Sequence, residues 1–213
     1  SIQYVNKWQS LKIIMKKVFV NGYGSIGSRI TKFIKDDPDI DVVGIGKYSS
    51  NEKVQHVIND GFSVYVPGDK IDNFKNYDIS GSIESVIDNC DLVIDASPGG
   101  NGFVNKKNIY EPKGIKAIFQ GGETIFNDKS VADILFNSRV NYAEAFDKNY
   151  VMQGSCNVTG MGRILNPLRE KYADKLSRFD ATLIRRWADL EQTDKQTVDT
   201  IEMTEQPHHG TDV

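Results

Sequence analysis

The sequence predicts an α/β fold, in which a doubly wound parallel sheet is followed by the start of a second, α+β domain. Short apolar runs alternate with helical patterns from residue 15 to about residue 155, which is the order expected of parallel strands joined by crossover helices. Several of these runs end in glycine-rich loops, and sheets of this kind bind ligands outside the carboxyl ends of their strands. We therefore expect a Rossmann-type, dinucleotide-binding domain over 15–155.

The first strand, turn and helix open this domain. Residues 18–21 form an apolar run that leads into a glycine turn, and apolar residues then recur at helical spacing until Pro38 ends the helix. A second apolar run at 42–45 closes a strand–helix–strand unit of about 30 residues. The later pattern predicts a helix at 52–58, Ser82 as the N-cap of a short helix, a turn at Pro67-Gly68, and strands at 62–66, 92–96, 117–119 and 150–153.

Composition excludes several classes of function. The 213 residues carry 26 Lys and Arg against 29 Asp and Glu, a net charge of -3, so nucleic acid and membrane surfaces are not expected partners. Two cysteines cannot build a disulfide framework, which favours a cytoplasmic protein. Residues 1–14 lack the features of a signal peptide. We expect them to be an extension that the fold does not need, with an extra edge strand as the alternative.

The loop Gly22-Tyr23-Gly24-Ser25-Ile26-Gly27 matches the pattern G-x-G-x-x-G. Its position between a strand and a helix raises its value: the first glycine permits a tight turn, the second lets the backbone approach a pyrophosphate, and the third permits close packing of the helix on the strand. The N-terminus of the helix supplies free N–H donors for phosphate. The alternative is a turn that only reverses the chain.

Lys47 stands at the end of the second strand, where an NAD site usually carries a carboxylate for the ribose 2′-hydroxyl. A cation there would pair with a 2′-phosphate instead. The sequence therefore predicts NADP as the cofactor, with NAD as the alternative. A solvated surface lysine is the competing interpretation.

Cys156 follows the last strand of the first domain and begins a helix. A helix N-terminus favours thiolate over thiol, which makes the sulfur nucleophilic near neutral pH. Beside a nicotinamide, such a thiol could attack an aldehyde, pass a hydride to the cofactor and retain a thioester. Cys90, just before a core strand, is expected to be a packing residue.

Residues 156–213 are predicted to begin a second, incomplete domain, with a helix that Pro167 should bend or restart and a strand-like alternation at 178–186. The pairs Arg185-Arg186 and His208-His209 are candidates for anion binding, or surface charge. His56 is expected to be solvated on a surface helix.

Five segments together resemble the archaeal-type, phosphorylating glyceraldehyde-3-phosphate dehydrogenases. They are M-K-K-V-F-V-N-G-Y-G-S-I-G from Met15, A-I-F-Q-G-G-E from Ala117, S-C-N from Ser155, R-R from Arg185 and H-H-G from His208. The resemblance covers residues 15–213. It implies an NAD(P)-dependent aldehyde dehydrogenase of glycolysis or gluconeogenesis, a homotetramer of the cytoplasm when full length, whose partners are a sugar phosphate and inorganic phosphate and which needs no metal.

The resemblance also implies roles for individual residues. Cys156 would be the nucleophile, and the glycine loop, Lys47, Gly122 and Arg186 would contact the cofactor. The residues expected to hold substrate or phosphate are Ser155, Asn157, Thr159, Arg185, His208, His209 and Gly210.

Some positions depart from the family pattern. Val158 replaces the first of two common threonines, Trp187 replaces a small residue, and the family's catalytic histidine would lie beyond Val213. Two alternatives therefore stay open. One is a dehydrogenase of the same architecture that acts on another semialdehyde or acyl phosphate, and the other is a non-catalytic, dinucleotide-binding regulatory chain.

Overall fold

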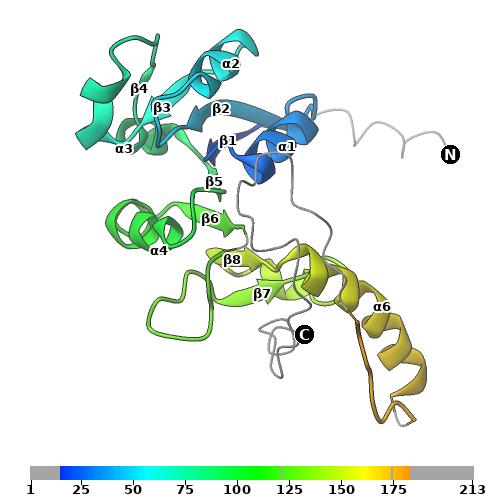
Figure 1. Cartoon of the computed structure of the whole chain (residues 1–213). Helices are drawn as coiled ribbons and strands as arrows, with labels where there is room; N and C mark the ends of the chain where they lie inside the picture. Colours follow the sequence, from blue (N-terminus) through cyan, green and yellow to red (C-terminus); the bar gives the residue numbers. More distant parts are fainter. Residues whose placement is uncertain (1–14, 121, 174, 183–213) are drawn as a thin grey trace, which may run out of the picture.

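The structure, a computed structural model, describes residues 15–120, 122–173 and 175–182, and it confirms the predicted α/β class. Eight strands form one sheet in the order β4-β3-β2-β1-β5-β6-β8-β7. Every neighbouring pair is parallel, and helices connect most of the successive strands (Figure 1). The strands are β1 (Lys16–Asn21), β2 (Ile40–Gly46), β3 (Val64–Val66), β4 (Gly81–Ser82), β5 (Leu92–Asp95), β6 (Lys116–Phe119), β7 (Ile134–Phe136) and β8 (Tyr150–Gln153).

The helical segments include two long helices, α1 (Ser25–Ile34) and α6 (Cys156–Tyr172). The shorter ones are α2 (Lys53–Asn59), η1 (Gly68–Phe74), α3 (Ile83–Val86), η2 (Ile87–Asn89), α4 (Asn101–Asn105), η3 (Lys106–Tyr110), α5 (Glu111–Lys113) and η4 (Tyr142–Ala145).

The strand order reverses beside β1. The chain runs from β1 to β2 on one side, and later returns to place β5 on the other side. The last residues of these three strands stand in register, with Asn21 opposite both Gly46 and Asp95. This reversal is the point at which doubly wound sheets bind dinucleotides.

Two apolar clusters cover the two faces of the sheet. Adjacent strand residues point to opposite faces, and Phe19 and Val20 accordingly belong to different clusters. Phe19 packs with Val93 and Phe119, whereas Val20 packs with residues of β2, α2 and β3. The central strand β1 is therefore buried on both faces and fixes the positions of the loops at its carboxyl end.

Several local predictions need correction. Residues 178–182 form no strand, because a strand needs a paired neighbour and no described strand pairs with them. Helix α6 runs through Pro167 without restarting. The predicted turn at Pro67-Gly68 is present, closed by the hydrogen bond from the Lys70 N–H to the Pro67 carbonyl at 2.9 Å, but it continues into the 3₁₀ segment η1. The short strands β4 and β7 and the helical stretch from α4 to α5 were not expected from the sequence.

Two other local predictions, the cap at Ser82 and the exposure of His56, are confirmed. The Ser82 hydroxyl accepts a hydrogen bond from the Ser85 N–H at 3.2 Å, as an N-cap does. His56 is exposed on α2. Across the described ranges, no helix has the length and apolar character needed to span a membrane, and no cluster of His, Cys, Asp and Glu side chains suits a metal ion. Of the predicted second domain at 156–213, the described residues form only helix α6 and a short stretch after it. The second domain therefore stays a prediction.

Candidate active site

The glycine loop between β1 and α1 meets the steric demands predicted for it. Gly22 has φ +118°, a conformation that side chains rarely adopt, and a β-carbon there would collide with the Ala96 carbonyl and lie 2.8 Å from the Ser97 nitrogen. A β-carbon on Gly27 would collide with the Gly22 carbonyl. No described residue lies within 4 Å of the position that a β-carbon on Gly24 would take. Two glycines thus permit packing, and the third leaves the backbone open to an incoming group.

Helix α1 begins at this open position. Gly24 is its N-cap, and the helix has neither a side-chain cap nor an acidic residue in its first turn. The first N–H groups of a helix have no acceptor within it, and they carry partial positive charge. This end of α1 is therefore suited to a phosphate. Of the other residues in the loop, Ser25 begins the helix and Ile26 is 45% exposed, whereas the Tyr23 hydroxyl lies 3.4 Å from an Asp60 carboxylate oxygen.

The loop after β5 adjoins the glycine loop on one side and the loop after β6 on the other. A β-carbon on Gly99 would lie 3.2 Å from the Gly122 carbonyl oxygen. The Glu123 carboxylate accepts hydrogen bonds from the Gly100 and Gly102 N–H groups, each at 2.9 Å. Burial raises the pKa of Glu123, while these N–H bonds act to lower it. Glu123 therefore links the loop after β6 to the loop after β5. This role was not predicted from the sequence.

Gly122, a predicted cofactor contact, lies in this part of the site. It has φ +98°, which favours glycine. It lines a hollow of about 470 Å³ together with Gly100, Phe103, Val104, Glu123, Thr124 and Lys129. The carboxyl edge of the sheet thus has open space beside the loops of β5 and β6.

Lys47 lies directly after β2, as predicted, and is only 6% exposed. Its N–H donates to the Tyr65 carbonyl at 2.8 Å. The interpretation of Lys47 as a solvated surface lysine is therefore wrong. Its role toward a 2′-phosphate stays a prediction.

A group of buried polar side chains lies near the carboxyl ends of β1, β2 and β5. This group was not predicted from the sequence. Asn21, Asp95, Asn105 and Tyr110 are each at most 6% exposed, and the Tyr48 hydroxyl reaches the same group. We call these five residues the carboxyl-edge network. Its only sequence signal is that polar residues end two apolar strands, at Asn21 and Asp95.

Cys156 is the first residue of α6 and is exposed. It follows β8. In the sheet, β8 is separated from β1 by β6 and β5. Strands lie about 4.8 Å apart, so three strand spacings place the start of α6 about 14 Å from the glycine loop along one sheet edge. The thiol and the glycine loop therefore share the edge at which such sheets bind ligands.

The neighbours of Cys156 fix the start of α6. The Ser155 hydroxyl accepts from the Val158 N–H at 3.3 Å, which makes Ser155 the N-cap. The Thr159 hydroxyl accepts from the Gln153 amide at 2.7 Å and donates to the Gly154 carbonyl at 3.4 Å. The hydroxyl proton of Thr159 is thus already used in the bond to Gly154. Asn157, the residue that follows Cys156 in the chain, is half-buried.

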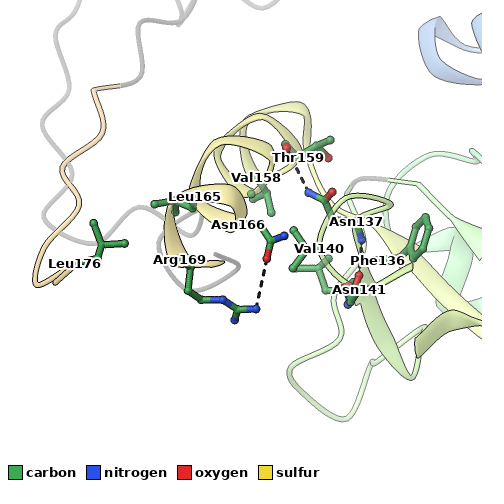
Figure 2. A pocket seen from close by; sticks show the side chains of 12 residues that line it. Phe136, Asn137, Val140, Asn141, Val158, Thr159, Leu165, Asn166, Arg169 and Leu176 are labelled. Carbon is green, nitrogen blue, oxygen red and sulfur yellow. Dashed lines mark hydrogen bonds between the residues drawn. The ribbon is translucent and has the colours of Figure 1, made fainter. Parts of the chain in front are cut away.

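Val158 points away from the exposed surface. It is 6% exposed and lines an apolar cavity of about 380 Å³ between α6 and the segment from β7 to Asn141 (Figure 2). Across this cavity the Asn137 amide donates to the Thr159 carbonyl at 3.3 Å. Valine in place of threonine therefore falls on a packing position.

Cys90 behaves as the predicted packing residue. Its thiol donates to the Val86 carbonyl at 3.2 Å and packs against the core. Burial, followed by the charge of Asp91, raises the pKa of this thiol to about 12. The two cysteines thus differ as the sequence indicated, one half-buried and one exposed. The predicted residues Arg185, Arg186, His208, His209 and Gly210 lie outside the described residues.

Sequence comparisons agree with this arrangement. The chain is 38% identical over 191 residues to a glyceraldehyde-3-phosphate dehydrogenase of Sulfolobus acidocaldarius, a match that covers 89% of this chain and 54% of the relative. The chain is a homologue of the archaeal glyceraldehyde-3-phosphate dehydrogenases. The enzyme of that name from Halobacterium salinarum is 38% identical over 205 residues, covering 93% of this chain and 59% of the relative.

The match to these dehydrogenases is partial in length. The chain spans between 54% and 59% of the two relatives named above. No family model matches the chain. Among solved structures, aspartate semialdehyde dehydrogenase with NADP from Candida albicans is similar at a TM-score of 0.48 and 18% identity, covering 74% of this chain and 48% of that chain.

Proposed function

We propose that the full-length protein is an NAD(P)-dependent, phosphorylating glyceraldehyde-3-phosphate dehydrogenase. The observation that carries the proposal is an exposed thiol, Cys156, at the start of α6 on the sheet edge that also holds the glycine loop. The homology to dehydrogenases of that name supports it.

The residues at the sheet edge fit a dinucleotide. The open backbone at Gly24 and the uncapped start of α1 suit a pyrophosphate. In this proposal, Ser25 and Ile26 flank the phosphates, Gly122 contacts the cofactor at its other end, and Lys47 favours NADP. Arg186 is proposed as a further cofactor contact from outside the described residues. When bound, the nicotinamide would accept the hydride of the hemithioacetal, which leaves a thioester on Cys156.

Cys156 would supply the covalent chemistry. Its sulfur bonds to the aldehyde carbon, and the carbonyl oxygen takes up a proton, giving the hemithioacetal. Inorganic phosphate then attacks the thioester carbon, the carbon–sulfur bond breaks, and the products are 1,3-bisphosphoglycerate and the free thiolate. The general base would be the histidine that the resemblance places beyond Val213.

Two groups of residues would hold the substrate. Ser155 and Asn157 flank the thiol in the chain, and Thr159 follows one turn later in α6. The other proposed phosphate ligands, Arg185, His208, His209 and Gly210, lie outside the described residues.

The test measures NADPH formation from NADP, glyceraldehyde 3-phosphate and inorganic phosphate with the full-length protein. We expect activity that depends on phosphate and falls by at least about a thousandfold in Cys156→Ser, because a hydroxyl is a far weaker nucleophile than a thiolate. The matched control is Cys90→Ser, which keeps a donor for the Val86 carbonyl and should retain activity.

Each other outcome has a defined meaning. Activity that survives Cys156→Ser contradicts every version of the thiol mechanism. Activity with another semialdehyde, but not with the sugar phosphate, moves the assignment to another substrate. Dinucleotide binding without any turnover supports the regulatory alternative. The homotetramer and the cytoplasmic location stay predictions, which sedimentation and cell fractionation would check.

A further inference from the structure

The carboxyl-edge network joins three segments that are distant in sequence. Asn21 ends β1, Asp95 ends β5, and Tyr48 lies two residues beyond β2. Asn105 and Tyr110 reach the same group from α4 and η3. Because Asn21 and Tyr110 are fully buried and Asp95 is 3% exposed, the donors and acceptors of these side chains bond mainly to one another rather than to water.

The hydrogen bonds converge on two oxygens. The Tyr48 hydroxyl accepts from the Asn21 amide at 3.0 Å and from the Asn105 amide at 2.9 Å. An Asp95 carboxylate oxygen accepts from Asn105 at 2.9 Å and from the Tyr110 hydroxyl at 2.6 Å. Asn21 also donates to Tyr110 at 2.7 Å. Each amide therefore connects the tyrosine after β2 to the rest of the network.

Both tyrosines remain protonated at physiological pH. Burial, followed by the charge of Asp95, raises the pKa of Tyr48 and the pKa of Tyr110. The hydroxyls thus act as neutral hydrogen-bonding groups. The network is suited to holding segments in place.

One end of the network holds the segment after β2. Among the described residues, the side-chain amide oxygen Oδ1 of Asn21 has no hydrogen-bond partner, and it occupies the space that a β-carbon on Gly46 would need. The Lys47 N–H is bonded to β3, and Tyr48 is bonded to the network. On its outer side, the Tyr48 ring has the Lys70 ammonium 6.0 Å from its centroid, which brings a second cation near this segment.

The other end of the network holds the loop after β5. The second Asp95 carboxylate oxygen accepts from the Ser97 N–H at 3.0 Å and from its hydroxyl at 2.6 Å. Ser97 in turn adjoins Gly22. The network therefore ties the segment that would contact the adenosine ribose to the loop beside the phosphates.

From this arrangement we propose that Tyr48 is a positioning residue for cofactor choice. Its hydroxyl, bonded to Asn21 and Asn105, fixes the backbone that carries the adjacent Lys47, and its ring lies near the Lys70 ammonium. In this proposal, the two lysines distinguish a ribose 2′-phosphate from a 2′-hydroxyl. The proposal rests on the dinucleotide binding in the proposed function, and it assigns to Tyr48 no contact with the reacting atoms.

The test is calorimetric titration of the full-length protein with NADPH and with NADH, which needs no substrate turnover. Tyr48→Phe keeps the ring under Lys70 and removes only the hydroxyl with its two hydrogen bonds. We expect the dissociation constant for NADPH to rise about tenfold and that for NADH about twofold, since two hydrogen bonds of ordinary strength are lost. The ratio of the two constants should therefore change about fivefold.

Tyr110→Phe is the matched control. It removes a hydroxyl from the same network, but Tyr110 lies on η3 and not beside Lys47. Its melting temperature should fall, with the ratio of the two constants unchanged within twofold. The proposal is overturned if Tyr48→Phe lowers only the melting temperature, or if both variants change the ratio equally.

Two further outcomes keep the test decisive. If Tyr48→Phe does not fold, Asn105→Ala removes one of the two bonds to the same hydroxyl and should change the ratio about threefold, and an unchanged ratio overturns the proposal. A protein that binds both dinucleotides but lacks dehydrogenase activity contradicts the proposed function alone. A protein that binds neither dinucleotide contradicts both.

Discussion

The starts of α1 and α6 use one structural device in two ways. Each helix follows a strand of the same parallel sheet, and neither has an acidic residue in its first turn. Gly24 begins α1 without a side-chain cap, whereas the Ser155 hydroxyl caps α6 and Cys156 follows it. The first helix thus leaves bare N–H groups for an anion from outside. The second offers its positive end to a side chain of its own.

The comparison separates what backbone and side chains contribute. At α1 the sequence removes side chains, so that close contacts and an open surface come from glycine. At α6 the sequence adds a hydroxyl for the cap and a thiol for chemistry. Substitutions should therefore act mainly through folding at the first site and mainly through reactivity at the second.

The largest expected effect on folding is at Gly22. Gly22→Ala should destabilise the protein by more than about 3 kcal/mol, because the substitution combines an unfavourable φ with a backbone collision at Ala96. Gly24→Ala is the matched control, since φ is -87° there and the space is open, and it should change stability by less than about 1 kcal/mol. Urea denaturation measures both. Equal losses would contradict the division of roles within the loop.

The two thiols should differ strongly in their rates of alkylation. The Cys90 thiol, with a pKa of about 12, is ionised to only about one part in ten thousand at pH 8 and is half-buried, whereas the Cys156 thiol is exposed to the reagent. We expect iodoacetamide to label the exposed Cys156 at least about a hundredfold faster than Cys90 in the folded protein. Peptide mapping by mass spectrometry measures the rates, and in urea the difference should vanish. Fast labelling of Cys90 in the folded protein would contradict its burial.

A smaller effect is expected from the cap of α6. Ser155→Ala should lower the free energy of unfolding by about 1 kcal/mol, and it should also slow alkylation of Cys156 by loosening the first turn. Ser82→Ala removes a similar cap from α3, remote in sequence from the thiol. It should cost a similar free energy without changing the labelling rate. If both variants slow labelling equally, the cap of α6 has no special role at the thiol.

Sequence alone was sufficient where a requirement is local. The steric demands at Gly22 and Gly27 follow from spacing, because each concerns the backbone of one turn, and the structure shows the predicted close contacts at both. The approach of a pyrophosphate at Gly24 stays a prediction. The Ser82 cap and the position of Cys156 at the start of a helix were predicted for the same reason.

Sequence alone was insufficient where contacts are distant. Asn21 bonds to Tyr48, Asp95 and Tyr110, which lie 27, 74 and 89 residues away in the chain. No spacing rule connects such residues before the strand order is known. The two-residue strand β4 and the three-residue β7 escaped prediction similarly, because they are defined by their neighbours. The burial of Lys47 also depends on tertiary packing.

The central place of β1 has a consequence during synthesis on the ribosome. One edge of β1 pairs with β2, but its other edge waits for β5, whose paired residues come 74 positions later. A nascent chain that has emerged only as far as β4 would therefore expose a long, unpaired apolar strand edge, which is a template for aggregation. Chaperone dependence should accordingly be greatest before residue 95 leaves the exit tunnel.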